Sequence, residues 1–381
     1  RPTMDLEAPT TFLVVEASQC ERVHGLLKSN GWLEAHVEPM RGDAGTVGFP
    51  LVVGANGETV QAVANSELGV SSECIVAEVA RRDSVDPHHR LTKAVQTWLD
   101  THQPSLKAAG LVPTKWERLG DLVLFPQEWR LAEAWAMVRQ HPHITALWEA
   151  MAEALKVTSL GVQAPIADDT FRSSQVEMLL GSSEVEFTDH GMTYAFDAAK
   201  VMFSSGNVTE RRRIGGMNMQ GEVVVDAYAG VGYYTFPMLV HAGAAHVHAC
   251  EINPASIAGL RAGAAANGLL ERLTVHEGDN HVALLGLKEV ADRCHLGLLP
   301  SSEPMWEPCL LALKPSGGVL HVHMNVEEER IEAWTAATIH TFESLVAKHG
   351  LGFTVQATHV ERVKWFAPRV RHVVLDLSFR P

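Results

Sequence analysis

Two short apolar runs, separated by a segment with helical periodicity, stand out in the hydrophobic pattern of the second half of the chain. The first, Val223 to Val225, ends at Asp226, and the second, His246 to Cys250, ends at Glu251. Runs of this length are typical of buried parallel strands, and residues 233–242 between them are predicted to be helical. The segment is therefore predicted to be a βαβ unit, whose ligand would lie beyond the carboxyl ends of the strands.

The alternation of apolar strands and helical segments continues to the C-terminus. Alternation of this kind is typical of an α/β fold with a largely parallel sheet. Together with the two strands above, it predicts a Rossmann-like sheet of seven strands. The further helices are predicted at 254–267 and 327–349, and the further strands at 273–276, 294–299, 319–323, 354–360 and 372–377.

The first half of the chain has a different pattern, which predicts two smaller domains. Residues 1–110 read as a small α/β domain without recognisable chemistry, and residues 111–203 as an α+β domain. In the second of these, a helical run is predicted at 130–155, with its tryptophans in the core, and a hairpin at 184–196. The remaining residues, 204–381, are predicted to form the domain that contains the seven-stranded sheet.

The glycines after the first strand indicate which ligand the sheet would bind. A dinucleotide-binding motif has a third glycine at the position that Thr235 occupies here, so NAD or FAD is disfavoured. The spacing Asp226-x-x-x-Gly230-x-Gly232 is instead similar to motif I of the class I S-adenosylmethionine-dependent transferases. An ordinary strand–turn–helix with glycines at positive φ is the alternative. The acid at the end of the next strand, Glu251, favours the cofactor site, because a carboxylate there can accept bonds from ribose hydroxyls.

Composition predicts a soluble, cytoplasmic protein. Hydrophobic residues make up 46% of the chain and charged residues 20%, and no apolar run approaches the length of a membrane helix. The first residues do not resemble a signal peptide. The formal net charge of −14 argues against a surface that is basic throughout, although it is compatible with one basic face for nucleic acid.

Cysteine and histidine usage predicts neither a disulfide framework nor a metal site. The five cysteines are dispersed without a Cys-x-x-Cys motif, which is typical of reduced thiols. The twenty histidines include three close pairs, yet none lies in a recognisable ligand motif. They are interpreted as structural or surface residues, and no metal is expected. The close pairs are His88 with His89, His141 with His143, and His321 with His323.

Two basic stretches are candidates for contact with nucleic acid. Arg211 to Arg213 has the densest positive charge in the chain, with a solvated helix face as the alternative. Near the C-terminus, Lys364, Arg369 and Arg371 are interleaved with Trp365 and Phe366, a combination that would bind phosphate and stack on a base. The alternative is that these aromatic residues are core and the arginines solvated.

Several motifs in the second half resemble the eukaryotic tRNA wybutosine-synthesizing aminocarboxypropyltransferases. The resemblance is dense from about residue 184 to the C-terminus and thin before residue 111. It implies transfer of the 3-amino-3-carboxypropyl group of S-adenosyl-L-methionine to 4-demethylwyosine, beside the anticodon of phenylalanine tRNA. The motifs occupy residues 196–210, 225–233, 241–254, 278–280 and 296–303.

The resemblance also implies roles for individual residues. Ser204 and Arg211 would contact S-adenosylmethionine, and Glu251 its ribose. Asp279 and Asn280 would recognise its adenine, for which a carboxylate and a carboxamide supply the acceptor and the donor. Asp226 and Gly230 complete the expected cofactor site, and Ser301, Lys364 and Arg369 are the candidate contacts to the RNA substrate.

Two other functions remain open at this point. The related tRNA guanosine-37 N1-methyltransferases share the fold but have Asn-Leu-Pro after the fourth strand, whereas this chain has Leu298-Leu299-Pro300. A ring nitrogen that bears a proton benefits from a carboxamide that orients it, and a carbon nucleophile makes no such demand. The sequence therefore favours aminocarboxypropyl transfer over methyl transfer. A tRNA-binding scaffold without catalysis is the third possibility.

Overall fold

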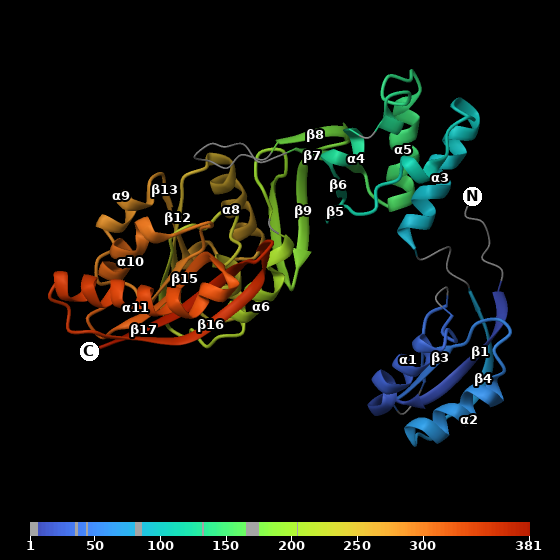
Figure 1. The fold of residues 1–381 in the computed structure, drawn as a ribbon, viewed down its shortest axis with the longest axis horizontal. Helices are drawn as coiled ribbons and strands as arrows, with labels where there is room; N and C mark the ends of the chain where they lie inside the picture. Colours follow the sequence, from blue (N-terminus) through green and yellow to red (C-terminus); the bar gives the residue numbers. More distant parts are fainter. Residues whose placement is uncertain are drawn as a thin grey trace. The chain divides into compact units, whose positions relative to one another are not determined.

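The structure is a computed structural model that describes residues 7–34, 37–42, 45–80, 86–131, 133–164, 175–203 and 205–381. The chain divides into two compact units, Arg1–Ala94 and Val95–Pro381, and Figure 1 shows the elements of each. Among the described residues, no helix is both long enough and apolar enough to cross a membrane.

The first unit contains a four-stranded antiparallel sheet with the strand order β2-β3-β1-β4. Its core includes Leu13, Phe49, Leu27 and Val60, which come from two strands and two helices. The predicted α/β character of this region agrees with these elements. They are β1 (Glu7–Glu16), α1 (Cys20–Ser29), β2 (Met40–Arg41), β3 (Thr46–Pro50), α2 (Gly57–Leu68) and β4 (Glu73–Ala80), followed by α3 (Pro87–His102), which continues into the second unit.

The second unit contains a small mixed sheet with the strand order β5-β6-β7-β8. The prediction of one long helix in this region is wrong. The run 130–155 is divided between the end of α4 and α5, and the described residues between them form the 3-10 helix η4 (Glu133–Trp135) and turns. Pro142, just before α5, cannot donate the backbone bond that a continuous helix needs. Trp135 and Trp148 are buried and stack at 5.5 Å, so their assignment to the core is confirmed. The elements are β5 (Glu117–Leu119), β6 (Leu122–Pro126), α4 (Gln127–Leu131), α5 (Ile144–Leu155), β7 (Ser159–Ala164) and β8 (Gln175–Leu180).

The predicted hairpin is confirmed as β9 (Glu184–Asp189) and β10 (Met192–Asp197). Its two turn residues, His190 and Gly191, both have positive φ, as a two-residue hairpin turn requires. After it come η5 (Ser205–Asn207) and α6 (Val208–Gly215), which lead into the large sheet.

The large sheet has the predicted seven strands, in the order β13-β12-β11-β14-β15-β17-β16. The first five are parallel, and β17 pairs antiparallel with both β15 and β16. The strand after Asp292 ends at Leu296, earlier than predicted. The strands are β11 (Val223–Asp226), β12 (His246–Glu251), β13 (Leu273–Glu277), β14 (Arg293–Leu296), β15 (Gly318–Glu327), β16 (Thr354–Ala367) and β17 (Val370–Arg380).

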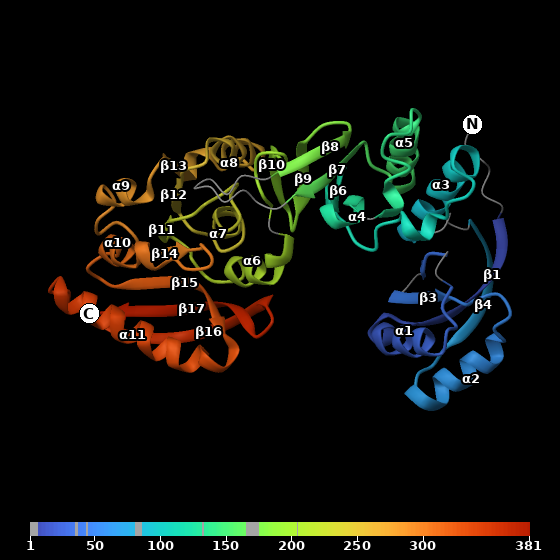
Figure 2. The same cartoon turned by 45° about the horizontal axis from the view of Figure 1, so that its top comes forward.

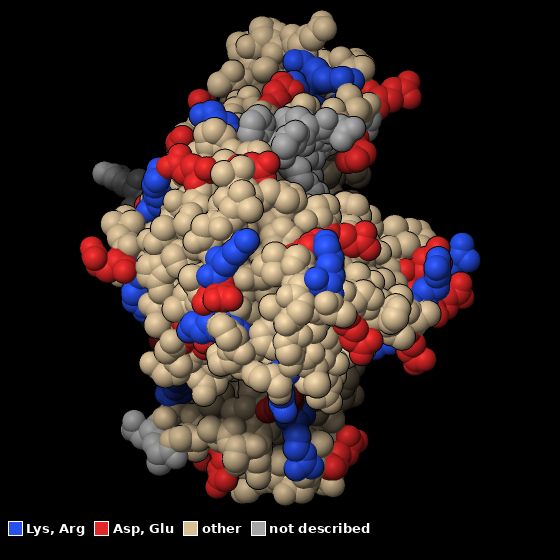
Figure 3. Space-filling model, turned by 90° about the vertical axis from the view of Figure 1, so that its left-hand side faces the viewer, with Lys and Arg blue, Asp and Glu red and all other residues tan. Residues whose placement is uncertain are grey.

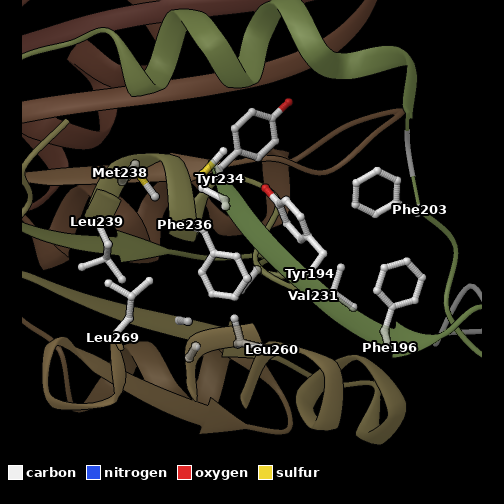
Figure 4. Packing of buried hydrophobic residues seen from close by; sticks show 14 of the residues in the cluster. Tyr194, Phe196, Phe203, Val231, Tyr234, Phe236, Met238, Leu239, Leu260 and Leu269 are labelled. Atoms are coloured by element: carbon white, nitrogen blue, oxygen red, sulfur yellow. The ribbon is translucent and has the colours of Figure 1, made fainter. Parts of the chain in front are cut away.

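Helices cover both faces of this sheet, as Figure 2 shows. On one face, residues of β10, α7 and α8, including Tyr194, Phe236 and Leu260, form a core that is seen in Figure 4. On the other face, α10 and α11 cover Leu320, Val322 and Leu375. The helices are α7 (Thr235–Val240), α8 (Pro254–Ala266), α9 (Asn280–Leu285), α10 (Trp306–Ala312) and α11 (Ile331–Lys348).

Candidate functional site

The turn after β11 can be formed only with glycine at two positions. Gly230 and Gly232 have φ of 57° and 98°. A Cβ on Gly230 would lie 2.3 Å from the ring of Tyr233, and one on Gly232 would lie 2.6 Å from the ring of Phe236. The turn therefore brings bare backbone to the carboxyl edge of the sheet, where a ligand can approach closely.

The carboxylate of Glu251, at the end of β12, holds this turn in place. Its Oε2 accepts the N–H of Gly230 at 2.8 Å, and its Oε1 accepts those of Ile252 at 2.9 Å and Asn253 at 2.8 Å. Burial raises the pKa of Glu251, while the three N–H bonds oppose that rise. A carboxylate has about four lone-pair positions, so one acceptor position remains for a ligand hydroxyl.

Asp226 lies beneath the turn and is fully buried. Its Oδ2 accepts the hydroxyl hydrogen of Thr235 at 2.7 Å. Thr235 stands where a dinucleotide-binding motif has its third glycine, and its hydroxyl fixes the carboxylate of Asp226 at the end of β11. From this position Asp226 shapes the turn, and it does not present its carboxylate to the crevice surface.

Asp279 and Asn280 lie at the start of α9, beside the glycine turn. Asp279 caps the helix, because its Oδ1 accepts the N–H of His281 at 2.8 Å, and its side chain is largely exposed. Asn280 donates from Nδ2 to the carbonyl of Ala227 at 3.0 Å. The carboxyl ends of β11, β12 and β13 therefore bring Gly230, Glu251 and Asn280 together along one edge.

Arg211 is placed differently from its neighbours on α6. It is 3% exposed, forms an ion pair with Asp189 at 2.9 Å, and lies 5.2 Å from the ring centroid of Phe203. Arg213 bonds to Glu210 and Asp376. The solvated-face interpretation of Arg211 to Arg213 is therefore wrong for two of the three. Ser204, the other predicted contact before α6, lies outside the described residues.

The C-terminal basic and aromatic stretch lies on the β16–β17 hairpin. Trp365 and Phe366 are 53% and 57% exposed, so the alternative that they belong to the core is wrong. The guanidinium of Arg371 lies 3.6 Å from the ring centroid of Trp365. Arg369 occupies the turn and is exposed. These side chains form a surface that can contact RNA.

The two other predicted substrate contacts lie on different elements. Ser301 follows β14, is bridged to Met324 of β15, and accepts the N–H of Glu303 through its Oγ at 3.2 Å. Lys364, in β16, lies against η5, since a Cβ added to Gly206 would be 2.7 Å from its Nζ. The structure thus brings Lys364 to the turn that precedes α6, and it places Ser301 in the loop after β14.

A chain of buried histidines was not predicted. His295 contacts His323 through their Nε2 atoms at 3.0 Å, and Nδ1 of His323 contacts Nε2 of His372 at 2.9 Å. Beside it, His321 bonds to Asp376 at 2.6 Å. The signal was the alternation in β15, which places His321, His323 and Asn325 on one face. Among the described residues, no group of three or more such side chains is arranged to hold a metal ion.

Asn325, at the end of this row, was also missed. Its Oδ1 and Nδ2 are both buried, and neither has a hydrogen-bond partner among the described residues. Its backbone N–H donates to the carbonyl of Pro300 at 2.9 Å, so it adjoins the loop after β14. Buried polar atoms without partners are costly, and they concentrate where a protein has another use for them.

Two family descriptions match most of the second unit. The TRM5/TYW2 methyltransferase domain matches residues 185–353, and the TYW2 N-terminal domain matches residues 102–184. The tRNA wybutosine-synthesizing protein 2 homolog of Danio rerio is 34% identical over 394 residues, which cover 93% of this chain and 95% of that protein. The chain belongs to the tRNA wybutosine-synthesizing protein 2 family. The resemblance predicted from the motifs is thereby confirmed.

The family includes longer proteins and solved structures. The tRNA wybutosine-synthesizing protein 2/3/4 of Arabidopsis thaliana is 37% identical over 315 residues, 82% of this chain, but the chain spans only 31% of that protein. TYW2 of P. horikoshii, in complex with MeSAdo, is 27% identical with a TM-score of 0.61 and covers 76% of this chain and 99% of its own. TYW2 of M. jannaschii, in complex with AdoMet, is 26% identical with a TM-score of 0.53, covering 70% and 99%. The predicted Rossmann-like transferase fold is confirmed.

Proposed function

We propose that this chain is an S-adenosylmethionine-dependent tRNA 4-demethylwyosine aminocarboxypropyltransferase. It would transfer the 3-amino-3-carboxypropyl group to the modified guanosine at position 37 of phenylalanine tRNA. The observation that carries the proposal is the likeness to a TYW2 bound to MeSAdo, methylthioadenosine. This nucleoside is what remains of S-adenosylmethionine after its amino-acid arm has left, and methyl transfer would leave S-adenosylhomocysteine.

The edge formed by β11, β12 and β13 suits the nucleoside part of the cofactor. The remaining acceptor position of Glu251 would take a ribose hydroxyl, and Asp279 and Asn280 would meet the adenine. The bare backbone of Gly230 would allow the methionine part to approach. Ser204 and Arg211 are proposed as further contacts, Arg211 through the segment that it helps to fix between Phe203 and Asp189.

The chemistry requires positioning more than activation. The nucleophilic carbon of the base forms a bond to Cγ of the methionine part, the S–Cγ bond breaks, and its electron pair stays on the sulfur of the departing thioether. The carbon also loses its proton, which balances the lost sulfonium charge. Whichever carbon of the sulfonium lies in line with the nucleophile reacts, so the protein selects the product by placing the arm.

The RNA would be held by the exposed residues of the β16–β17 hairpin. Trp365 and Phe366 offer stacking surfaces, and Arg369 offers a phosphate contact. Ser301, in the loop after β14, would lie near the target base. On the face in Figure 3, acidic and basic side chains are interspersed, which suits a chain of net charge −14 whose RNA contacts are concentrated locally.

Two isotopic labels distinguish the proposed function from methyl transfer. The protein is incubated with tRNA that carries 4-demethylwyosine and with S-adenosylmethionine labelled either in the carboxyl group or in the methyl group. We expect only the carboxyl label to enter the RNA. Entry of the methyl label would support the guanosine-37 N1-methyltransferase alternative, which the TYW2 N-terminal domain at residues 102–184 disfavours. Entry of neither label would support the scaffold.

A pair of variants tests the cofactor edge. Glu251→Ala removes three backbone contacts and the proposed ribose contact, whereas Asp279→Ala removes an exposed carboxylate. We expect both to weaken binding of S-adenosylmethionine in calorimetry, Glu251→Ala more strongly and with some loss of stability. Wild-type affinity in both variants would contradict the placement of the cofactor.

A further inference from the structure

Lys364 differs from the other partly or fully buried basic residues around it. On α6, β16 and β17, Arg211 pairs with Asp189, Arg213 with Glu210 and Asp376, and Arg371 with Glu328. Lys364 has no hydrogen bond or ion pair with any residue that the structure describes. A half-buried ammonium without a carboxylate is costly, so a counter-charge at this position would be favourable.

The ammonium of Lys364 lies next to the turn that connects to the cofactor edge. Its Nζ occupies the space that a side chain on Gly206 would fill. Two residues before η5, Phe203 packs at 5.5 Å against Tyr233, whose hydroxyl donates to the carbonyl of Met202. Tyr233 in turn covers Gly230. Lys364 therefore contacts a segment whose preceding residues, Met202 and Phe203, contact Tyr233 of the glycine turn.

The groups that surround Lys364 leave its charge uncompensated. Burial lowers the pKa of Lys364, and the nearby charge of Arg211 lowers it further. Directly across on β17 is His372, whose pKa burial lowers to about 4, so this neighbour is neutral at pH 7. From η5, the neighbour is the backbone of Gly206. The carboxylate of Asp376 on β17 is already bonded to Arg213 and His321, and η5 contains no acidic residue. The anion is therefore left to a ligand.

We propose that Lys364 binds the α-carboxylate of the methionine part of S-adenosylmethionine and so positions the arm that is transferred. This inference rests on the proposed function. It assigns Lys364 to the cofactor instead of to an RNA phosphate. The carboxylate is the one anionic group of S-adenosylmethionine, and it belongs to the group that must face the incoming base.

The burial of Lys364 favours the carboxylate over a phosphate of the RNA. Trp365 and Phe366, the next residues of the strand, are more than half exposed, and Arg369 at the hairpin turn is exposed. A bulky phosphodiester backbone can reach those residues from solvent. Lys364 is half-buried instead, and its Nζ lies against Gly206 of η5, a position less accessible to an RNA backbone than the exposed hairpin turn.

Methylthioadenosine provides the deciding comparison, because it contains the adenosine and sulfur of the cofactor but lacks the carboxylate. In calorimetry, we expect Lys364→Met to weaken binding of S-adenosylmethionine by about tenfold or more, as for loss of a charge-assisted hydrogen bond. The affinity for methylthioadenosine should stay within about twofold of wild type. Lys364→Arg, which keeps the charge, should retain part of the difference between the two ligands.

The exposed lysine Lys288 gives a matched control, since Lys288→Met makes the same change in net charge away from the hairpin. Thermal unfolding and filter binding of tRNA are measured on each variant, and Lys364→Gln is used if Lys364→Met does not fold. An equal loss of affinity for both nucleosides would overturn the inference, as would weaker tRNA binding with unchanged S-adenosylmethionine binding. If the wild type binds S-adenosylmethionine but transfers no group to tRNA, the proposed function fails while the carboxylate contact stands.

Discussion

The two faces of the strands β14, β15 and β17 are built from alternate residues of the same segments, yet they differ completely in chemistry. One face presents Leu320, Val322 and Leu375 to α10 and α11 and is apolar. The other presents a row of buried polar residues. Its members include His295, His321, His323, His372, Asp376 and Asn325, whose two side-chain polar atoms are buried.

The comparison shows two ways of filling an interior. The apolar face is stabilised by the area that it removes from water, and it tolerates changes that preserve volume. The histidine face depends on partners, because each buried polar atom must find one. Where the partners are complete, as for Asp376 with His321 and Arg213, the row connects the sheet to α6. Where they are missing, as at Asn325, it lies beside the loop after β14.

The largest effect is expected on the apolar face. Phe342 is fully buried and packs against Trp306 at 5.2 Å and Phe379 at 5.5 Å. Phe342→Ala should lower the free energy of unfolding by about 3–5 kcal/mol, because it leaves a cavity that cannot fully collapse. Urea unfolding measures this loss, which should be the same at pH 5 and pH 7. A strong pH dependence of the loss would show that the two faces are energetically coupled.

The histidine face should make stability depend on pH. Burial lowers the pKa of His321 and of His372 to about 4. Between that value and about 6.5, the unfolded histidines are protonated while the folded ones are neutral, so the unfolded state binds more protons and stability falls as the pH falls. For His372 alone the loss is about 3 kcal/mol.

Urea unfolding across this pH range tests the expectation with His372→Leu. This variant should flatten the dependence, whereas Phe342→Ala should keep its slope. An unchanged slope in His372→Leu would mean that His372 does not remain neutral in the folded protein.

A smaller loss is expected when one partner of the polar network is neutralised. Asp376→Asn keeps the shape of the side chain but removes the charge that His321 and Arg213 share, and it should cost about 2–3 kcal/mol at pH 7. These partners lower the pKa of Asp376. Its contribution is therefore complete above the unfolded pKa and is lost as the pH falls toward the folded one. Glu329→Gln, at an exposed acid, is the control, and equal stabilities of the two variants would count against the network.

The smallest effect should have the opposite sign. Asn325→Leu replaces two buried atoms that lack partners with apolar ones of similar volume, and it should raise stability by about 1 kcal/mol. Thermal unfolding detects the gain. A loss of stability would show that the carboxamide of Asn325 has hydrogen-bond partners in solution, and that the polar row lacks no partner there.

The seven-stranded sheet and its helices were predictable because short β-branched apolar runs indicate buried strands, and apolar residues at helical spacing indicate helices with one buried face. The turn at Gly230 and the acid Glu251 were predictable for the same reason, since strand ends are visible in the sequence. The break was missed because residues 130–155 were interpreted as one helical run although Pro142 interrupts it. The alternation in β15 indicates only that its histidines share a face. Their contacts could not be predicted, because they join three strands whose pairing is set by the tertiary fold.

The β16–β17 hairpin has one consequence for how the two substrates bind. The Nζ of Lys364 lies against Gly206, where we propose that it binds the cofactor, and Arg369, five positions later in the sequence, is exposed. A tilt of this hairpin would move both side chains at once. Binding of S-adenosylmethionine and binding of tRNA should therefore be cooperative, so that each ligand raises the affinity for the other by the same factor.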